Sequence, residues 1–459
     1  MRKILATIVG FMMAVAAGAQ QDDSLFIKKI SDEILLNGKA YDQLRELTKN
    51  IGQRLAGSAA MVKAENWGLA LMQSTGADKA WLQECMVPHW VRGGKDQLDY
   101  TPRPGNAAKK KRSLDVIALG NSMGTGPAGI TSTVIEIGTF AELEQKKDLV
   151  KGKIVFFNYK FRKDFIKTFD AYGDAVRYRG GGPSAAAKYG AKAVIVRSMS
   201  MSTDNVPHTG GTSYDSAYTK IPAVAIGLMD ADWLSSTLAK EPVMVTMKTN
   251  GHFLPDTIGH NVIGELRGSE FPDQVITIGG HLDSWDIGEG AHDDGTGCVQ
   301  TVEMLRTFQA LGYKPKHTIR FVLFANEENG TRGGKKYAEE AKAKNEKQVF
   351  ALESDDGGFT PRGFGLTMSD EQFKKVSSWL PLLAPYGTSY FSKGGGGSDI
   401  NPLNTTLQTP LAGFEPDTQR YFDLHHTRAD VFENVNKREL LLGAVNMTAL
   451  IYLVDKYGL

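Results

Sequence analysis

The sequence predicts an α/β fold, in which a mixed sheet is flanked by helices and carries an inserted β-rich segment. Two observations support this class. From residue 260 onward, apolar runs typical of strands alternate with helical segments, the pattern of layered α/β domains with a mainly parallel sheet. Between about residues 120 and 250, short strands are separated by glycine-rich turns and one helical stretch, so this block is interpreted as an insertion.

The overall composition is that of a folded, nearly neutral protein. Of its 459 residues, 41% are hydrophobic and 23% are charged, which is ample for a large core and for more than one domain. Lys and Arg number 53 and Asp and Glu number 52, so the net charge is +1. Such a balance provides no global field that would attract nucleic acid or an anionic membrane, and we expect neither as a partner.

The first 19 residues are predicted to be a secretory signal peptide. Two basic residues, Arg2 and Lys3, precede an apolar run over residues 4–17, and small residues end the segment at Ala19. No Cys lies near the expected cleavage point and no later run reaches about 18 uninterrupted apolar residues, so no membrane anchor is expected. The mature chain is therefore predicted to be exported to the periplasm or the extracellular medium.

Three parts are expected in the mature chain. Residues 20–119 would be the N-terminal part of the main domain, with helical spacing from 26 to 72, broken near the "GSAA" stretch, and an exposed basic connector at 100–113. Residues 120–250 would be the insertion, with strands at 134–138, 153–158, 193–198 and 223–227 and a helical stretch at 182–190.

Residues 251–459 would form most of the main domain. Its expected strands are at 260–268, 274–280, 318–326, 348–354 and 410–415. Its expected helices are at 296–311, 334–344, 370–380 and 436–457. The N-terminal helices are expected to pack back onto this sheet.

One loop is unusually rich in ligand-type side chains: "GGHLDSWDIGEGAHDDGTG", residues 279–297. Ionised carboxylates this close together raise one another's pKa, so the cluster is costly unless a cation lies among them. The loop is therefore either solvated or metal-binding.

Polar groups also follow the other predicted strands of the main domain. Four strand ends deliver such pairs: His281 and Asp283, Glu327 and Glu328, Asp355 and Asp356, His425 and His426. Any one pair alone is typical of a solvated loop. Because ligands in open α/β sheets bind at the carboxyl ends of strands, the four together predict one shared site, and mixed His and carboxylate ligands suit zinc.

These motifs resemble those of the di-zinc aminopeptidase family of zinc exopeptidases. The resemblance rests on "GGHLDSWDIGEGAHDDGTG", "NEENGTRGG", "ESDDGG" and "HHTRAD". Further stretches, "RSLDVIALGNSMGT", "LVKGKIVFFN", "VPHTGGTSY" and "SKGGGGSDINPL", are also similar, so the resemblance covers nearly all of the mature chain. It implies a phosphorylase/hydrolase-like α/β catalytic domain, with the insertion as a protease-associated domain.

The resemblance implies two zinc ions per chain and a role for each motif residue. The implied metal ligands are His281, Asp293, Glu328, Asp355 and His426, with Asp293 bridging both ions. Glu327 would be the general base and Asp283 the carboxylate that orients His281. His425 is an alternative to His426, which is preferred because Thr427 and Asp430 follow it as in the family pattern.

The glycine-rich stretch "SKGGGGSDINPL" is interpreted as part of the substrate pocket, with Gly396, Gly397 and Ser398 offering backbone N–H groups to a free carboxylate. A flexible linker is the alternative. Cys85 and Cys298 are expected to be free thiols, although one disulfide is possible in an oxidising compartment. Neither has a neighbouring base typical of a thiolate nucleophile.

The resemblance thus predicts an exported exopeptidase that acts on short peptides, above all dipeptides with free ends, and forms a homodimer. Two other functions stay open at this point. One is a non-catalytic receptor-like or peptide-binding module that has lost its ligands, which the complete ligand set argues against. The other is a single-zinc glutaminyl cyclase, and the presence of both His281 and Asp355 favours two metals and hydrolysis.

Overall fold

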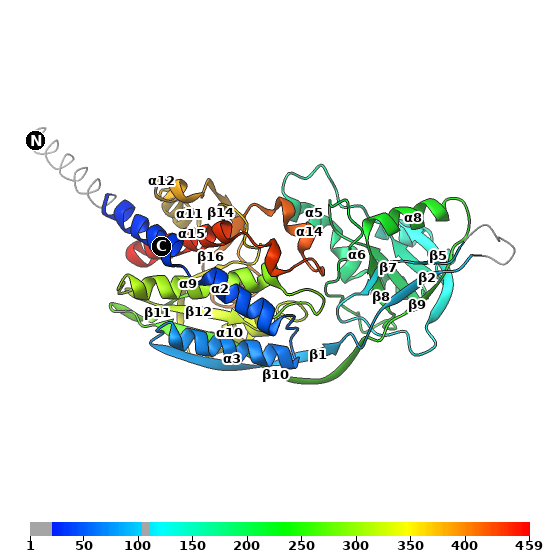
Figure 1. Ribbon diagram of the computed structural model, residues 1–459, viewed down its shortest axis with the longest axis horizontal. Helices are drawn as coiled ribbons and strands as arrows, with labels where there is room; N and C mark the ends of the chain where they lie inside the picture. Colours follow the sequence, from blue (N-terminus) through cyan, green and yellow to red (C-terminus); the bar gives the residue numbers. More distant parts are fainter. Residues whose placement is uncertain (1–20, 103–109) are drawn as a thin grey trace, which may run out of the picture.

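Two sheets, each packed against helices, organise the chain. The computed structural model describes residues 21–102 and 110–459, so the predicted signal peptide lies outside the described residues. Figure 1 shows two lobes side by side, which we call the main lobe and the inserted lobe, joined by the long strands β1 (Lys79–Val91) and β10 (His252–Leu266). The two strands pair antiparallel, from Lys79 opposite Glu265 to Val91 opposite His252.

The sheet of the main lobe is mixed, as predicted. Within the described residues it has eight strands in the order β1-β10-β12-β11-β13-β16-β14-β15. The remaining strands are β11 (Phe271–His281), β12 (His317–Phe324), β13 (Lys347–Glu353), β14 (Pro361–Thr367), β15 (Tyr390–Lys393) and β16 (Leu411–Pro416). The four central strands β12, β11, β13 and β16 run parallel, so their carboxyl ends share one edge of the sheet.

Helices cover both faces of this sheet. On one face the core contains Ile276 and Ile278 of β11 together with residues of α2 (Ala40–Glu46), α3 (Ala59–Ser74), α9 (Thr296–Ala310), α15 (Lys437–Tyr457) and the helix at 21–37. On the other face, Val322 and Phe324 of β12 pack with α10 (Arg332–Ala343) and α13 (Asn401–Leu407). Helices on both faces confirm the predicted α/β class, a mixed sheet flanked by helices.

Helix α15 is the core helix of the main lobe. In the described part of the chain it is the helix long and apolar enough to cross a membrane by length and composition. However, 83% of its most apolar stretch is buried inside the fold, and Leu450 and Ile451 are fully buried. The shorter helices α11 (Asp370–Ser377) and α12 (Leu380–Leu383) lie on the same lobe.

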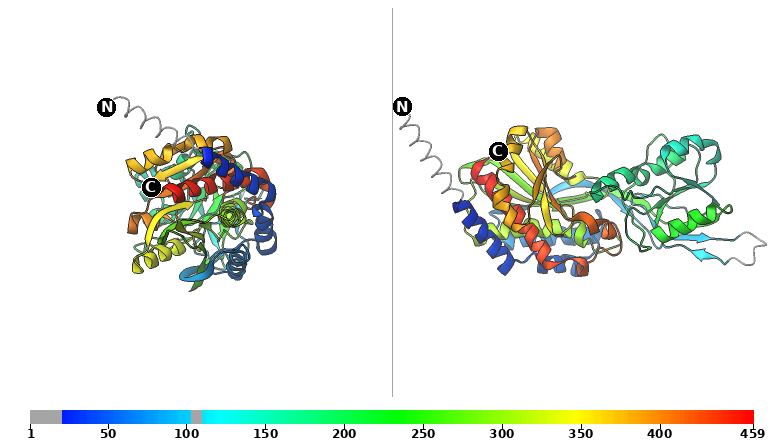
Figure 2. Two further views of the ribbon diagram at one scale, coloured as in Figure 1. Left: turned by 90° about the vertical axis from the view of Figure 1, so that its left-hand side faces the viewer. Right: turned by 90° about the horizontal axis from the view of Figure 1, so that it is seen from above.

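The inserted lobe holds the second sheet, in the order β3-β2-β9-β5-β6-β7-β8-β4 among the described residues. Its strands are β2 (Gln97–Tyr100), β3 (Arg112–Ser113), β4 (Val116–Ala118), β5 (Ile130–Ile137), β6 (Ile154–Phe157), β7 (Ala193–Arg197), β8 (Ala223–Ile226) and β9 (Met244–Lys248). Its helices are α4 (Phe140–Gln145), α5 (Thr168–Ala175), α6 (Arg177–Gly180), α7 (Gly182–Ala187) and α8 (Leu228–Leu238). Figure 2 shows this lobe projecting away from the main one.

Two expectations for the insertion need correction. The second sheet begins at Gln97 rather than near residue 120, because β2 pairs with β9 and buries Leu98 and Tyr100 in the core of the inserted lobe. Part of the segment at 100–113, interpreted as a connector, therefore belongs to a β-hairpin. The insertion is also an α/β unit with parallel central strands rather than mainly β. Most of its helices were not predicted, because they are short and carry little apolar periodicity.

Candidate metal centre

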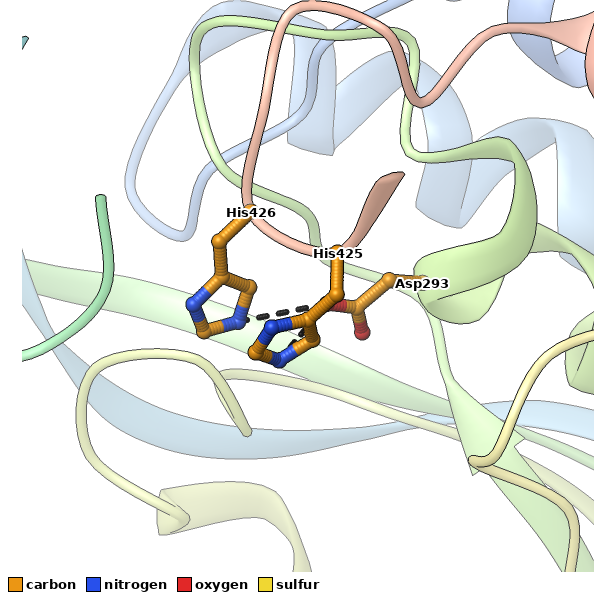
Figure 3. Close-up of side chains that lie close together, drawn as sticks. All are labelled: Asp293, His425 and His426. Atoms are coloured by element: carbon orange, nitrogen blue, oxygen red, sulfur yellow. Dashed lines mark ion pairs between the residues drawn. The ribbon is translucent and has the colours of Figure 1, made fainter. Parts of the chain in front are cut away.

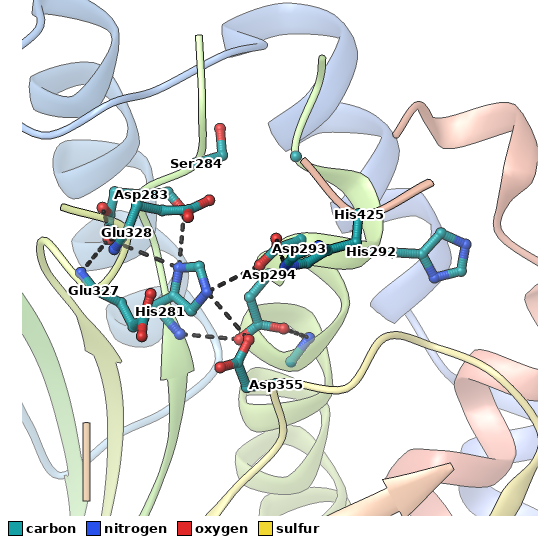
Figure 4. Close-up of polar contacts among 12 residues, drawn as sticks. His281, Asp283, Ser284, His292, Asp293, Asp294, Glu327, Glu328, Asp355 and His425 are labelled. Carbon is teal, nitrogen blue, oxygen red and sulfur yellow. Dashed lines mark hydrogen bonds and ion pairs between the residues drawn. The ribbon is translucent and has the colours of Figure 1, made fainter. Parts of the chain in front are cut away.

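The four predicted strand ends meet at one place, at the carboxyl edge of the main sheet (Figure 4). His281 is the last residue of β11, and Glu328 and Asp355 lie just after β12 and β13. His425 and His426 follow the short helix α14 (Tyr421–Leu424), after β16. The parallel pairing of these strands is what brings residues so distant in sequence together.

His281 faces two carboxylates. Its Nε2 lies 3.2 Å from Asp293 Oδ1 and 3.2 Å from Asp355 Oδ1, and its Nδ1 lies 2.9 Å from the backbone carbonyl of Asp283. Burial lowers the pKa of His281, but Asp355 and Asp293 outweigh it and hold the pKa well above its usual value. A ring proton on Nδ1, donated to that carbonyl, leaves Nε2 free to bind a cation.

His426 forms a second group on the other side of Asp293. Its Nε2 lies 3.1 Å from Glu328 Oε2 and 3.2 Å from Asp293 Oδ2. Burial lowers the pKa of His426, but Glu328 and Asp293 raise it to about 10. Asp293 therefore directs one oxygen to the His281 group and the other to the His426 group.

Both adjacent histidines face Asp293, as Figure 3 shows. Their rings stack with centroids 3.5 Å apart, and His425 Nε2 lies 3.7 Å from Asp293 Oδ2. By distance alone, Asp293, His425 and His426 could share an ion. We favour His426 as the ligand because it is closer to Asp293 and also contacts Glu328, whereas His425 packs its ring against Tyr172 and Tyr421.

The donor set fits a cation. Asp293 Oδ2 is buried and accepts no hydrogen bond. The nitrogen Nε2 of His426 lies 3.2 Å away from it. Burial and Asp293 raise the pKa of Glu328 to about 8, and burial raises that of Asp355 to about 6 despite the nearby His281. Carboxylates crowded in this way, together with two imidazoles, are the ligands that zinc prefers, and a cation would relieve their repulsion.

Asp283 contacts more than the His281 ring. Its carboxylate accepts the backbone N–H of Glu327 at 2.9 Å and of Glu328 at 3.3 Å, while its Oδ1 lies 3.7 Å from His281 Nδ1. The ring is held by the backbone carbonyl of Asp283 instead. Burial raises the pKa of Asp283 to about 6.

Three further residues support the centre, and this supporting role was not predicted for any of them. Asp294 accepts the backbone N–H of His281 and Gly297, both at 2.9 Å, and its peptide bond with Asp293 is cis. Asp430 accepts the backbone N–H of Asp293 at 3.1 Å. Both acids belong to the motifs quoted above, and this is the sequence signal from which their role could have been predicted.

The third supporting residue is Arg54, which is fully buried. It donates to the backbone carbonyls of Leu282, Glu289 and Gly290, which holds the acidic loop in shape. No sequence pattern marks Arg54, because its contacts are made with a loop more than two hundred residues away.

A cavity of about 470 Å³ opens over the candidate ligands and is lined by both lobes. From the main lobe, Glu327, Ser398 and Tyr421 line it beside the ligands. From the inserted lobe come Asn121, Phe169, Tyr172, Arg179, Gly211, Thr212 and Ser213. Asp356, next to Asp355, instead lines a neighbouring pocket beside Glu415.

The glycine-rich stretch only partly meets the expectation. Ser398 lines the cavity, but Gly396 and Gly397 are not among the lining residues. A Cβ at Gly397 would lie 2.1 Å from the carboxyl carbon of Glu353, so this glycine permits close packing on that side chain. The N–H groups that follow, of Asp399 and Ile400, donate to Glu353 rather than into the cavity.

Both cysteines are buried free thiols, as expected. Cys298 Sγ lies 3.0 Å from the backbone oxygen of His281, and burial raises the pKa of Cys85 to about 12. A thiol held protonated in this way is a poor nucleophile, so neither Cys supplies one here.

Comparison with known proteins identifies relatives of this chain. The sequence profile of peptidase family M28 matches residues 261–451. Carboxypeptidase Q of Xenopus laevis is 34% identical over 427 residues, which cover 92% of this chain and 88% of that protein. A crystal structure of a peptidase M28 precursor from Shewanella amazonensis superposes with a TM-score of 0.89 at 31% identity, covering 95% of this chain and 97% of that one.

A fourth match supports the fold alone. The structure of BSAP, a zinc aminopeptidase from Bacillus subtilis, superposes with a TM-score of 0.65 at 23% identity. The match covers 90% of this chain and 94% of that one.

Proposed function

Because the chain belongs to peptidase family M28, a family of metallopeptidases, we propose that it is an exported di-zinc exopeptidase that releases amino acids from short peptides, above all dipeptides with free ends. The observation that carries the proposal is the position of Asp293. One of its oxygens faces His281 and Asp355, and the other faces Glu328 and His426. A carboxylate between two half-sites is what a pair of cations requires.

Each half-site would hold one zinc ion. His281 and Asp355 would bind the first, Glu328 and His426 the second, with Asp293 shared. When bound, the ions would lower the pKa of the attacking water and polarise the scissile carbonyl. Asp283 and Asp430 hold the ligand-bearing backbone in place through their carboxylates.

Glu327 is proposed as the general base. It lines the cavity, and its side chain makes no hydrogen bond or ion pair within the described part of the chain, so its carboxylate is available to the reaction. Its backbone is held by Asp283, next to the ligand Glu328. Glu327 would take a proton from the attacking water and pass it to the leaving amine.

The size of the cavity supports short substrates. Its volume of about 470 Å³ is at the low end of the range for small-molecule sites, and aromatic residues of the inserted lobe, Phe169 and Tyr172, form part of its wall. A wall supplied by a second lobe limits how far a peptide can extend beyond the scissile bond. This favours cleavage at a chain end.

Other parts of the proposal rest on the family resemblance. We propose that the inserted lobe is a protease-associated domain, that the mature chain forms a homodimer, and that residues 1–19 direct export. Mass spectrometry of the protein released by its host tests the last point, because cleavage after Ala19 would leave Gln20 as the first residue.

Hydrolysis of a dipeptide panel by the zinc-loaded mature chain tests the activity. Release of free amino acids, with N-acetylated dipeptides and long peptides cleaved poorly, is the expected result. Cyclisation of N-terminal Gln without hydrolysis would favour a single-zinc glutaminyl cyclase. Tight peptide binding with neither reaction would favour a binding module. The complete set of five metal donors supports hydrolysis over both.

A further inference from the structure

A second cavity lies beside the metal centre, on the side of Asp355. It has a volume of about 550 Å³ and is lined by Asp356, the residue directly after that proposed ligand. Phe169 lines both this cavity and the one over the candidate ligands. We call the second cavity the side pocket. Because the two cavities share a wall, a side chain of a substrate held over the metals has a second space to enter.

Part of the wall of the side pocket is apolar. Ile166 and Phe169 contribute to it from the inserted lobe, and Tyr390 and Pro416 from the main lobe. Aliphatic and aromatic surfaces of this kind suit a chain of methylene groups, such as the stem of a lysine or arginine side chain.

Two glycines of β14 position the polar groups of the side pocket. A Cβ at Gly363 would lie 2.7 Å from Tyr390 Cε2, and one at Gly365 would lie 2.5 Å from Glu415 Oε1. Because both glycines lack this atom, the tyrosine ring and the carboxylate lie directly against the strand. The Tyr390 hydroxyl donates to Glu415 Oε2 at 2.7 Å and the Ser392 hydroxyl to Oε1 at 3.1 Å. The carboxylate of Glu415 is thus held in a fixed position at the pocket wall.

The side pocket carries an excess of acidic groups. Its lining includes four acids and two bases: Asp170, Asp356, Glu415 and Asp417, and Lys167 and Arg362. Arg362 is paired with Asp417 at 2.6 Å. The side chain of Asp356 makes no hydrogen bond or ion pair within the described part of the chain. Its carboxylate is therefore available to a cation from outside the chain, and the attraction is strongest away from bulk water.

One ammonium group of the chain already lies at the rim of the side pocket. The Nζ of Lys167, an exposed residue just before α5, is 3.5 Å from Glu415 Oε2 and 5.6 Å from the centre of the Tyr390 ring. A carboxylate beside an aromatic face is thus already used here to hold an ammonium group. Asp356 has no such partner, so the chemistry of the missing group is that of a second cation.

We propose that the side pocket binds the cationic side chain of a lysine or arginine in the substrate, an inference that rests on the proposed peptidase function. The methylene stem would lie along Phe169 and Tyr390, and the charged end would contact Asp356. The residue bound in this way is the one whose backbone lies over His281 and Asp355. Dipeptides with a basic residue at that position are then the preferred substrates.

Steady-state kinetics on Lys-Leu and Leu-Lys test the proposal, each compared with the same dipeptide containing norleucine in place of lysine. Norleucine keeps the methylene stem and lacks the amine. For the zinc-loaded mature chain, kcat/KM at one of the two positions should be about 10- to 100-fold higher with lysine than with norleucine. Equal values at both positions, or higher values with norleucine, would overturn the proposal.

Three variants locate the effect. Asp356→Asn should lower kcat/KM for the lysine dipeptide far more than for the norleucine dipeptide, mainly through a higher KM, and Glu415→Gln should do so in part. Lys167→Met should increase the preference for lysine, because it frees Glu415 for the cation of the substrate. Glu371→Gln, at an exposed acid in α11, is the matched control for Glu415→Gln and should keep the preference of the unchanged chain. Equal losses on both dipeptides in Asp356→Asn and Glu415→Gln would show a merely structural role and overturn the proposal.

Calorimetric binding of free lysine and norleucine to the same zinc-loaded proteins tests the pocket without turnover. Tighter binding of lysine that is lost in Asp356→Asn supports the proposal, and equal binding of the two amino acids to the unchanged chain contradicts it. If lysine binds in this way but no dipeptide is hydrolysed, the peptidase function fails and the side pocket stands. If dipeptides are hydrolysed without a preference for lysine, the peptidase function stands and the role of the side pocket fails.

Discussion

The carboxylate of Asp283 accepts the backbone N–H of Glu327 at 2.9 Å, which ties the loop after β11 to the loop after β12. The same carboxylate accepts the N–H of Glu328 at 3.3 Å, and the backbone carbonyl of Asp283 receives His281 Nδ1 at 2.9 Å. One residue thus positions a ligand from each half-site and the proposed base. The geometry of the centre therefore depends on a group that need not touch a metal.

Replacing Asp283 tests this dependence. In Asp283→Asn the amide cannot accept both N–H groups, so we expect kcat/KM to fall by about 10- to 100-fold and zinc to bind more weakly. Asp273→Asn is the matched control, because Asp273 is an exposed residue at the far end of the same strand. Kinetics and zinc titration measure both effects, and equal behaviour of the two variants would contradict the role given to Asp283.

The two adjacent histidines should separate by metal content. His426 Nε2 contacts both Glu328 and Asp293, whereas His425 Nε2 lies 3.7 Å from Asp293 and contacts no other carboxylate within the described residues. His426→Gln should therefore lose one zinc ion per chain, and His425→Gln should retain both. Elemental analysis after dialysis against trace zinc measures the stoichiometry. The reverse pattern would make His425 the ligand.

Gly210 should tolerate no side chain. In Gly210→Ala the new Cβ would meet the Arg179 guanidinium and the His426 ring, and its φ of 126° is unfavourable for alanine. We expect a loss of about 1–3 kcal/mol in the free energy of unfolding together with reduced hydrolysis. The control is Gly173→Ala in α5, where a Cβ meets nothing within 4 Å. Thermal unfolding of both variants measures the difference, and a Gly210→Ala protein as stable as the control would refute the packing argument.

His208 should make the protein sensitive to acid. Burial lowers its pKa to about 4, and its Nδ1 is buried without a hydrogen-bond partner. The unfolded chain binds the proton at about pH 6.5, whereas the folded chain binds it only near pH 4. The contribution of His208 to the free energy of unfolding is therefore fully present above about pH 6.5. As the pH falls toward 4, this free energy decreases by up to about 3 kcal/mol.

Urea unfolding of metal-free protein at about pH 7 and about pH 5 measures this loss, with His208→Gln and the exposed His252→Gln compared at each pH. His208→Gln should lose less stability on acidification than either the unchanged chain or His252→Gln. The same loss in all three proteins would show that other groups cause the acid sensitivity.

The sequence predicted the parts of the fold that depend on local pattern. The runs that became β11, β12 and β13 are apolar because they are buried on both faces, and each is followed by a ligand-type residue at its carboxyl end. The hairpin of β2 and β3 was missed because it flanks a basic, proline-containing segment that is typical of a connector.

What the sequence could not predict are contacts between distant segments. Arg54 and Arg179 carry no motif, and their positions beside the centre follow only from how the N-terminal segment and the inserted lobe pack. Gly396 and Gly397 were assigned to the substrate pocket because glycine-rich loops expose N–H groups. In the fold, Gly397 instead makes room for the Glu353 side chain. A glycine required for close packing cannot be distinguished in a sequence from one that exposes its N–H to a ligand.

The most direct test of the di-zinc peptidase account is zinc content and dipeptide hydrolysis, measured together for the mature chain and for Glu327→Ala. The account predicts two zinc ions per chain in both proteins and a loss of at least about 100-fold in kcat in the variant alone, since Glu327 moves a proton but binds no metal. A variant that keeps its activity, or an unchanged chain that binds no stoichiometric zinc, would contradict it.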